Sequence, residues 1–249
     1  HEVRNKAIKI FEEKGFPTRK EEAWKYTSIN PLLKPDYTIV SNKEKNVPVE
    51  KVREFFLHDI DTYKIVFIDG VYSAFLSETT HDTVDVCLLS SALSKSQYQP
   101  VIEAYFNKAA KSDGLTALNT AFTREGAYIR IPAHKEVRKP IEIINFSTGN
   151  EAAIFLQPRN LIVVEENAHV QIIERHQSLS DNAVLTNSVT EIFAEKRAHV
   201  DYYKVQNDRL SASLIDNTYI SQERESICHV HTFSFGGNIV RNNLNFFQK

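Results

Sequence analysis

The sequence has no methionine, only seven glycines and only two cysteines among its 249 residues. So few glycines leave little material for a loop that cradles phosphate, and no GxGxxG, GK[ST], HExxH or GxSxG motif occurs. Cys87 and Cys228 are too far apart for a CxxC motif or a zinc knuckle, and sparse cysteine suits a reducing compartment. The missing methionines predict that some residues were omitted or that the chain is part of a larger gene product. A measured mass of 28.5 kDa would contradict that prediction.

The chain also lacks an excess of charge and a long apolar run. Its formal net charge is −2, which argues against nucleic acid as a partner, because binding there depends on neutralising phosphates. No apolar run approaches the roughly 20 residues of a membrane span, and the first residues do not form the apolar core of a signal peptide. With 42% hydrophobic and 25% charged residues, the composition is that of one large or two modest globular domains. We therefore expect a cytoplasmic protein that binds neither nucleic acid nor membrane.

What the sequence does contain is a repeat in its second half. Ala168-His169-Val170 recurs 30 residues later as Ala198-His199-Val200 and 30 residues later again as Cys228-His229-Val230. Each triplet is followed by a short run rich in strand-forming residues. A fixed period of roughly 20–50 residues is typical of a solenoid, in which each unit buries its apolar face against the next. The repeat predicts stacked β-rungs, where a rung is one circuit of the solenoid.

The first half of the chain has a different pattern. Residues 3–14 carry apolar side chains on one helical face, Thr18 and Glu21 form a capping box that predicts a second helix from Arg19, and Pro100 begins a helix expected to reach Lys111. Asp69-Gly70 predicts a hairpin between strands 63–68 and 71–76. We expect a largely helical α/β domain over 1–125 and a β-solenoid over 126–249. The further strands expected are 84–89, 128–132, 141–146, 152–156, 161–165, 170–174, 189–193, 200–205, 214–220 and 227–235.

The repeated histidines are the candidates for chemistry. Because side chains alternate along a strand, residues flanking each histidine point inward and the histidines point outward, about 4.8 Å apart on successive rungs. Imidazoles at that spacing could bind a transition metal, and His169, His199, His229 and Cys228 are the candidate ligands. Against this, we expect no carboxylate or thiolate on the same face at the same level, which favours a solvated ladder of polar residues. The residues alone therefore assign no catalytic, cofactor-binding or metal-binding role.

Three stretches resemble the SufB/SufD family of iron–sulfur cluster assembly proteins, and the first is typical of its SufD type. Residues 16–27 read FPTRKEEAWKYT, residues 118–122 read LNTAF with Gly126, Pro132 and Lys139-Pro140-Ile141 following, and residues 236–244 read GGNIVRNNL. The family pattern for the first stretch is FPTRKxExWKYT. For the second it is LNxAF followed by G, (I/V)P and (K/E)PI, and for the third it is G…xRxxL. Within these motifs Trp24, Tyr26 and Arg241 are expected to be structural anchors.

The resemblance implies a helical N-terminal domain followed by a right-handed parallel β-helix with a scaffold role and no enzymatic activity. It implies a SufB-like subunit and a SufC-like ATPase as partners. A transient Fe–S cluster and a reduced flavin would then belong to the assembled complex rather than to this chain. The family continues past residues 236–244 to a late Cys/His segment and a C-terminal helical segment, so the β-helix is expected to be truncated here. Its open end would favour self-association, for example as a homodimer.

Two other functions are compatible with a β-helix. A carbohydrate-active enzyme would need aligned Asp or Glu residues on successive rungs for acid–base chemistry, and usually a secretion signal. Here the aligned position holds histidine. A stand-alone protein-interaction solenoid differs from a Suf scaffold only in its partners. The absence of the hexapeptide repeats of solenoid acyltransferases counts against that enzyme class.

Overall fold

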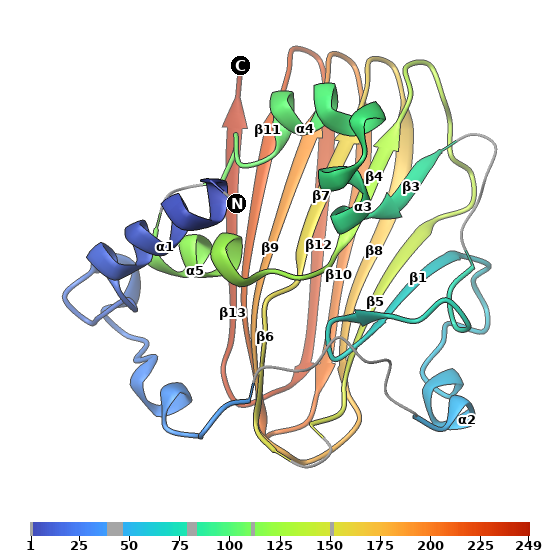
Figure 1. Cartoon of the computed structure of the whole chain (residues 1–249). Coiled ribbons are helices and arrows are strands. Elements are labelled where there is room, and N and C mark those ends of the chain that lie inside the picture. The colour runs from blue at the N-terminus through green and yellow to red at the C-terminus, as the bar shows by residue number, and fades with distance from the viewer. Residues whose placement is uncertain (1, 39–46, 79–83, 111–112, 150–151) are drawn as a thin grey trace.

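The computed structural model describes residues 2–38, 47–78, 84–110, 113–149 and 152–249. Two sheets, sheet I and sheet II, face each other, and the chain passes from one to the other as it winds along the molecule (Figure 1). Sheet I contains β1 (Tyr63–Ile68), β2 (Val71–Tyr72), β5 (Ile141–Ser147), β8 (His169–Ser178), β10 (His199–Asp208) and β12 (Ile227–Gly236). Sheet II contains β3 (Asp85–Leu88), β4 (Ala127–Ile131), β7 (Arg159–Val164), β9 (Val184–Ala194), β11 (Ala212–Gln222) and β13 (Val240–Gln248), with β6 (Ile154–Leu156) paired to β9.

The strand order confirms the predicted parallel β-solenoid. Sheet I runs β12-β10-β8-β5-β1-β2 and sheet II runs β13-β11-β9-β7-β4-β3. All neighbours are parallel except β1 with β2 and β3 with β4. Parallel neighbours need a crossover, and here the crossover from one rung to the next is a strand of the opposite sheet. Each 30-residue repeat therefore supplies two strands.

The core lies between the two sheets and is built from stacked apolar side chains. Val170 and Val200 from sheet I face Ile162, Ile192 and Ile220 from sheet II, and all five are fully buried. Burying one such side chain contributes about 1.5–3 kcal/mol, so the ladders stabilise each rung only when its neighbours are in place. Ala168 and Ala198 are buried in the same core, as the alternation predicts.

The rungs turn at equivalent positions. His134, Asn167, Arg197 and Glu225 each have a positive φ, between 55° and 63°, at the corner from sheet II to sheet I. The main-chain N–H groups of His134, Asn167 and Arg197 donate to the next corner along the solenoid, for example Asn167 N to Lys196 O at 3.1 Å. These ladders continue the sheet pairing through the corners.

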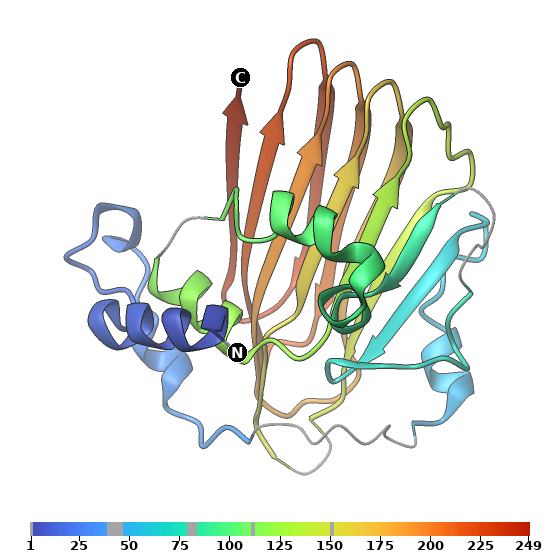
Figure 2. The same cartoon turned by 45° about the horizontal axis from the view of Figure 1, so that its top comes forward.

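Helices cover parts of the outer faces of both sheets. Helices α3 (Leu89–Ser94), α4 (Gln99–Tyr105) and α5 (Gly114–Phe122) lie outside sheet II, with α1 (Glu2–Lys14) beside α5, and α2 (Val49–Arg53) lies outside sheet I (Figures 1 and 2). Two 3₁₀ turns, η1 (Glu22–Trp24) and η2 (Asn30–Leu33), follow α1, and η3 (Ser96–Tyr98) precedes α4. No helix of the described ranges is long and apolar enough to span a membrane.

Most local predictions are confirmed. Helix α1, the strands and the hairpin at Asp69-Gly70 form where expected, and both hairpin residues have positive φ. Strand β2 ends at Tyr72, earlier than predicted, and β13 was not predicted as a strand. The boundary near residue 125 stays a prediction: β1 and β3 come from before it, yet they pair with β5 and β4 of the solenoid.

Two predicted helices are wrong in extent. The helix expected from Arg19 is reduced to η1, although Glu21 Oε1 accepts the capping hydrogen bond from Thr18 N at 2.9 Å. Burial of Trp24 in a cluster with Ile29 and Leu32 fixes the path of this segment instead. The helix expected to reach Lys111 ends at Tyr105, because the N–H groups of Asn107, Ala109 and Ala110 donate to Glu191 of β9 rather than continuing the helix.

Candidate functional site

Two of the repeated histidines stack on the outer face of sheet I. His169 begins β8, His199 begins β10, and their Cα positions are in register. Their ring centroids lie 4.4 Å apart with an interplanar angle of 8°. Both side chains are about one-third exposed, at 39% and 35%. The predicted outward ladder therefore exists for this pair.

The third histidine is displaced along its strand. His229 is in register with Asp201 rather than with His199, so the 30-residue spacing is not the structural spacing of the last step. The corner residues show why. Glu165, Glu195 and Glu223 occupy the same position at three successive corners, and they are separated by 30 and then 28 residues. The third copy therefore has two extra residues between the corner and its triplet. A shift of two preserves the direction of the side chains, so His229 still points outward.

The shift places all three histidines around one carboxylate. Asp201 lies 3.4 Å from His169 Nε2 and 3.3 Å from His199 Nε2, and its Oδ1 is 3.0 Å from His229 Nδ1. Burial raises the pKa of Asp201, but the hydrogen bonds from His229 and His169 and the nearby imidazoles outweigh it, so the net pKa is lowered. The expectation that no carboxylate shares this face is wrong, because residues two apart on a strand point the same way. We call His169, His199, Asp201 and His229 the histidine–aspartate cluster.

Cys228 faces away from this cluster. It is in register with Val200 and packs against the core between the sheets. Burial and the charge of Asp201 raise the pKa of its thiol to about 12, so the thiol is protonated near neutral pH. The structure thus places Cys228 on the opposite side of β12 from the three histidines.

A second group of polar side chains lies inside the solenoid. Glu174 accepts hydrogen bonds from Asn160 at 3.2 Å and from Tyr202, and its Oε1 lies 3.2 Å from His176 Nε2. Burial raises the pKa of Glu174, but the hydrogen bonds with His176 and Tyr202 and the charges of His176 and Lys204 lower it to about 2. Lys204 Nζ lies 2.5 Å from an Asp216 oxygen on the facing sheet. Glu174 is paired with His176, and Lys204 is paired with Asp216. This group is therefore an internal polar network that joins sheet I to sheet II.

A third group fastens the helices to the outer face of sheet II. Glu191 and Arg159 are fully buried and their side chains are 2.6 Å apart. Glu191 also accepts hydrogen bonds from the main-chain N–H groups of Asn107, Ala109 and Ala110 at 2.9–3.0 Å. Arg159 donates to the Asn107 side chain at 2.6 Å. The position of the segment after α4 is therefore set by one buried carboxylate.

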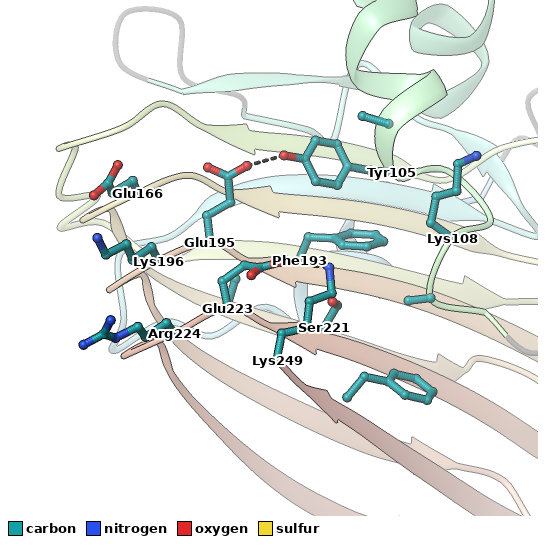
Figure 3. A pocket seen from close by; sticks show the side chains of 14 residues that line it. Tyr105, Lys108, Glu166, Phe193, Glu195, Lys196, Ser221, Glu223, Arg224 and Lys249 are labelled. Atoms are coloured by element: carbon teal, nitrogen blue, oxygen red, sulfur yellow. Dashed lines mark hydrogen bonds and ion pairs between the residues drawn. The ribbon is translucent and has the colours of Figure 1, made fainter.

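The cleft in Figure 3 lies next to that segment and is lined by charged side chains of both signs. Its volume is about 610 Å³. Tyr105 donates a hydrogen bond to Glu195 across it, and Lys249 pairs with Glu223 at 2.8 Å. These pairings leave the cleft without a dominant charge, so it does not indicate a particular ligand.

The expected structural anchors differ in their placement. Trp24 is 8% exposed, and the Arg241 guanidinium lies 4.2 Å from its ring centroid. Arg241 also donates to Ala23 O at 2.6 Å, which joins the N-terminal segment to β13. Tyr26 is 87% exposed, so its ring is not packed as an anchor in this structure.

Asp201 is the site residue that sequence reasoning missed. Its position two residues after His199 was a usable signal, since both must share a face if β10 is a strand. The offset of His229 follows from the 28-residue step between Glu195 and Glu223, whose equivalence is known from the corner hydrogen bonds of the structure. Arg159 and Glu191 gave no comparable signal, because neither belongs to a motif of recognisable spacing.

The fold defines the class of this protein: a two-sheet parallel β-solenoid with an N-terminal helical region packed on its outer faces. Comparison with known sequences then places it. The chain belongs to the SufBD family of the SUF system for iron–sulfur cluster assembly. The SufBD protein N-terminal region matches residues 1–143, and the SufBD core domain matches residues 146–249.

Several curated relatives are similar over nearly all of this chain. An iron–sulfur cluster assembly SufBD family protein of Synechocystis is 27% identical over 242 residues, which are 94% of this chain and 53% of the relative. The iron–sulfur cluster assembly protein SufD of Escherichia coli is 23% identical over 235 residues, 92% of this chain and 51% of the relative. Protein ABCI7, chloroplastic, of Arabidopsis thaliana is 22% identical over 259 residues, 99% of this chain and 52% of the relative. The chain thus spans about half the length of these relatives.

Proposed function

We propose that this chain is the N-terminal and central part of a SufD-type scaffold subunit that works in the cytoplasm with a SufB-like subunit and a SufC-like ATPase. The observation that carries the proposal is the match of both SufBD family regions, in order, to a chain that folds as a continuous solenoid. A solenoid offers a long rigid surface on which partners dock, because each rung is held by its neighbours. Two of the three relatives above are named as iron–sulfur cluster assembly proteins, and one of these as SufD.

The chain itself is proposed to have no enzymatic activity. Glycoside chemistry needs a free acid and a second carboxylate facing one groove. The buried glutamates are instead engaged: Glu142 pairs with Arg175 at 2.8 Å, Glu191 pairs with Arg159, and Glu174 is bonded inside the solenoid. This argues against the carbohydrate-active alternative. The stand-alone interaction solenoid is separated from the Suf scaffold by identifying partners.

In this proposal the Fe–S cluster is cargo of the complex, and reduced flavin also belongs to the complex. The prediction that this chain binds neither by itself can be checked by anaerobic purification of the chain with iron, sulfide and flavin analysis. Bound flavin in the isolated chain would contradict it.

The partner proposal is tested with the full-length protein that carries this chain. The tagged protein is purified from its native host under anaerobic conditions, and bound proteins are identified by mass spectrometry. We expect a SufB-like subunit and a SufC-like ATPase in constant ratio. Recovery of a lone monomer at native abundance would refute the assignment to a complex.

The isolated 249-residue chain is expected to self-associate. Strands β12 and β13 each lie at one edge of their sheet, and they expose Phe233, Phe235 and Phe246 at 47%, 56% and 44%. Unpaired parallel edges with exposed apolar side chains invite pairing with another chain. Analytical ultracentrifugation should show a concentration-dependent dimer, and a monomer at all concentrations would contradict the expectation.

A further inference from the structure

We infer that the histidine–aspartate cluster binds one divalent first-row transition-metal ion on the outer face of sheet I. The inference rests on side-chain geometry and does not depend on the proposed scaffold function. Four potential ligands come from three consecutive strands of sheet I: His169 from β8, His199 and Asp201 from β10, and His229 from β12. The donor atoms of His169, His199 and Asp201 all lie within 4.8 Å of one another.

The spacing of the donor atoms suits a common ion. An ion bound about 2.1 Å from each ligand requires neighbouring donor atoms about 2.9–3.4 Å apart, for octahedral to tetrahedral angles. The contacts of Asp201 with His169, His199 and His229 are 3.4, 3.3 and 3.0 Å. The donor atoms of His169, His199 and Asp201 thus form one group, and His229, which contacts Asp201 from the next strand, would join them by rotation of its exposed imidazole.

One nitrogen in the cluster lacks a satisfactory partner. His199 Nε2 is buried and lies 3.3 Å from Asp201 Oδ1, yet it forms no hydrogen bond within the described part of the chain. A buried imidazole nitrogen without a hydrogen bond is costly. Coordination of a metal would satisfy this nitrogen.

The solenoid preorganises the ligands. Strand β10 is paired on both sides, to β8 and β12, so His199 and Asp201 are fixed on a central strand. The two-residue shift of the last repeat brings His229 level with Asp201. Were the third triplet in the same register as the first two, His229 would lie beside His199 on the neighbouring strand instead of beside Asp201. The two-residue shift of the last repeat therefore places His229 directly beside Asp201.

The ligand set selects the class of metal. Three imidazoles and one carboxylate suit Zn²⁺, Co²⁺ and Fe²⁺, whereas Mg²⁺ and Ca²⁺ prefer oxygen ligands. The histidine side chains are 35–56% exposed, so water can complete the coordination and the ion can exchange. We therefore expect a reversible surface site rather than a closed structural one.

Cobalt binding tests the site directly. The chain is stripped with a chelator and titrated with Co²⁺, whose visible absorption reports coordination by nitrogen ligands, and Zn²⁺ is then added as a competitor. We expect one equivalent of Co²⁺ that Zn²⁺ displaces and Mg²⁺ does not. Asp201→Asn and His199→Gln should each weaken binding by at least roughly 10- to 100-fold, the loss found even for outer-shell partners of metal ligands. The matched control His58→Gln changes an exposed histidine outside the cluster and should bind like the wild type.

A second measurement needs no variant. The unaltered chain is treated with diethyl pyrocarbonate with and without Zn²⁺, and modified histidines are mapped by mass spectrometry. Zn²⁺ should protect His169, His199 and His229 but not His58 or His134. Equal modification of the cluster with and without Zn²⁺ would overturn the inference, as would unchanged Co²⁺ affinity in folded Asp201→Asn and His199→Gln variants.

Discussion

Replacing Glu191 with alanine tests whether one buried carboxylate holds the helical region on sheet II. The carboxylate is fully buried and accepts four hydrogen bonds, three from main-chain N–H groups and one from Arg159. Glu191→Ala removes all four and leaves the guanidinium without its charge partner. Breaking a buried ion pair by removing one member costs about 3–5 kcal/mol. Each unsatisfied N–H group adds about 1–3 kcal/mol unless the segment opens to water.

We therefore expect Glu191→Ala to lose at least about 3–5 kcal/mol, a large part of the roughly 5–15 kcal/mol that stabilises a typical domain. Urea unfolding measures the loss, with Trp24 fluorescence reporting the helical region and circular dichroism reporting the sheets. The two transitions should separate if the helical segment opens before the solenoid. The double variant Glu191→Leu with Arg159→Met should remain destabilised, because the main-chain N–H groups still lack an acceptor.

Glu166→Ala is the matched control. Glu166 pairs with Arg197 at the surface, where both side chains are about 40% exposed, and such pairs contribute about 0–1 kcal/mol. If Glu191→Ala were no more destabilising than Glu166→Ala, the argument from buried hydrogen bonds would be wrong. Separate unfolding of the helices in the wild type would also refute it.

Three further predictions concern the solenoid and its attachment. Burial lowers the pKa of His176, but the hydrogen bond and charge of Glu174 raise it above its ordinary value. Its stabilising contribution is therefore full below about pH 6.5 and is lost as pH rises through the raised pKa. The unfolding free energy should fall as pH rises above about 6.5, less so in His176→Gln, and equal slopes in the two proteins would contradict this. Gly126→Ala should prevent stable folding, because a Cβ there would lie 1.6 Å from a main-chain oxygen of β7; wild-type thermal stability would contradict that contact. Arg241→Ala should cost about 1–2 kcal/mol in urea unfolding and change Trp24 fluorescence, because it removes the guanidinium from the indole face; an unchanged spectrum would count against the stacking.

Much of the solenoid was predictable because its rule is local and repeated. Alternation along each strand predicted that Val170 and Val200 face inward and that His169 and His199 face outward, and the structure confirms both. The hairpin at Asp69-Gly70 was predictable for a similar reason, since the turn requires positive φ at both residues. The helix after Pro100 was predicted too long, because N–H groups of the residues after Tyr105 donate to Glu191, which is distant in sequence.

The candidate site was predictable in its residue types but not in its arrangement. The repeat identified His169, His199 and His229, yet it suggested a straight ladder without a carboxylate. The register between β10 and β12 instead places Asp201 opposite His229, so the cluster contains a carboxylate. Register depends on the hydrogen bonds of the corner before the strand, and the triplet spacing alone does not report them.

The sequence by itself determined the rung period, the inward and outward faces of the strands and the family, because each follows from short patterns of residues. Only the tertiary structure decided which side chains meet. It brought three histidines of successive rungs to Asp201 and buried Arg159 with Glu191 beneath the helices. Those contacts join residues about 30 or more positions apart, or depend on a two-residue shift in pairing. They are fixed by packing and hydrogen bonding across strands, which no local pattern encodes.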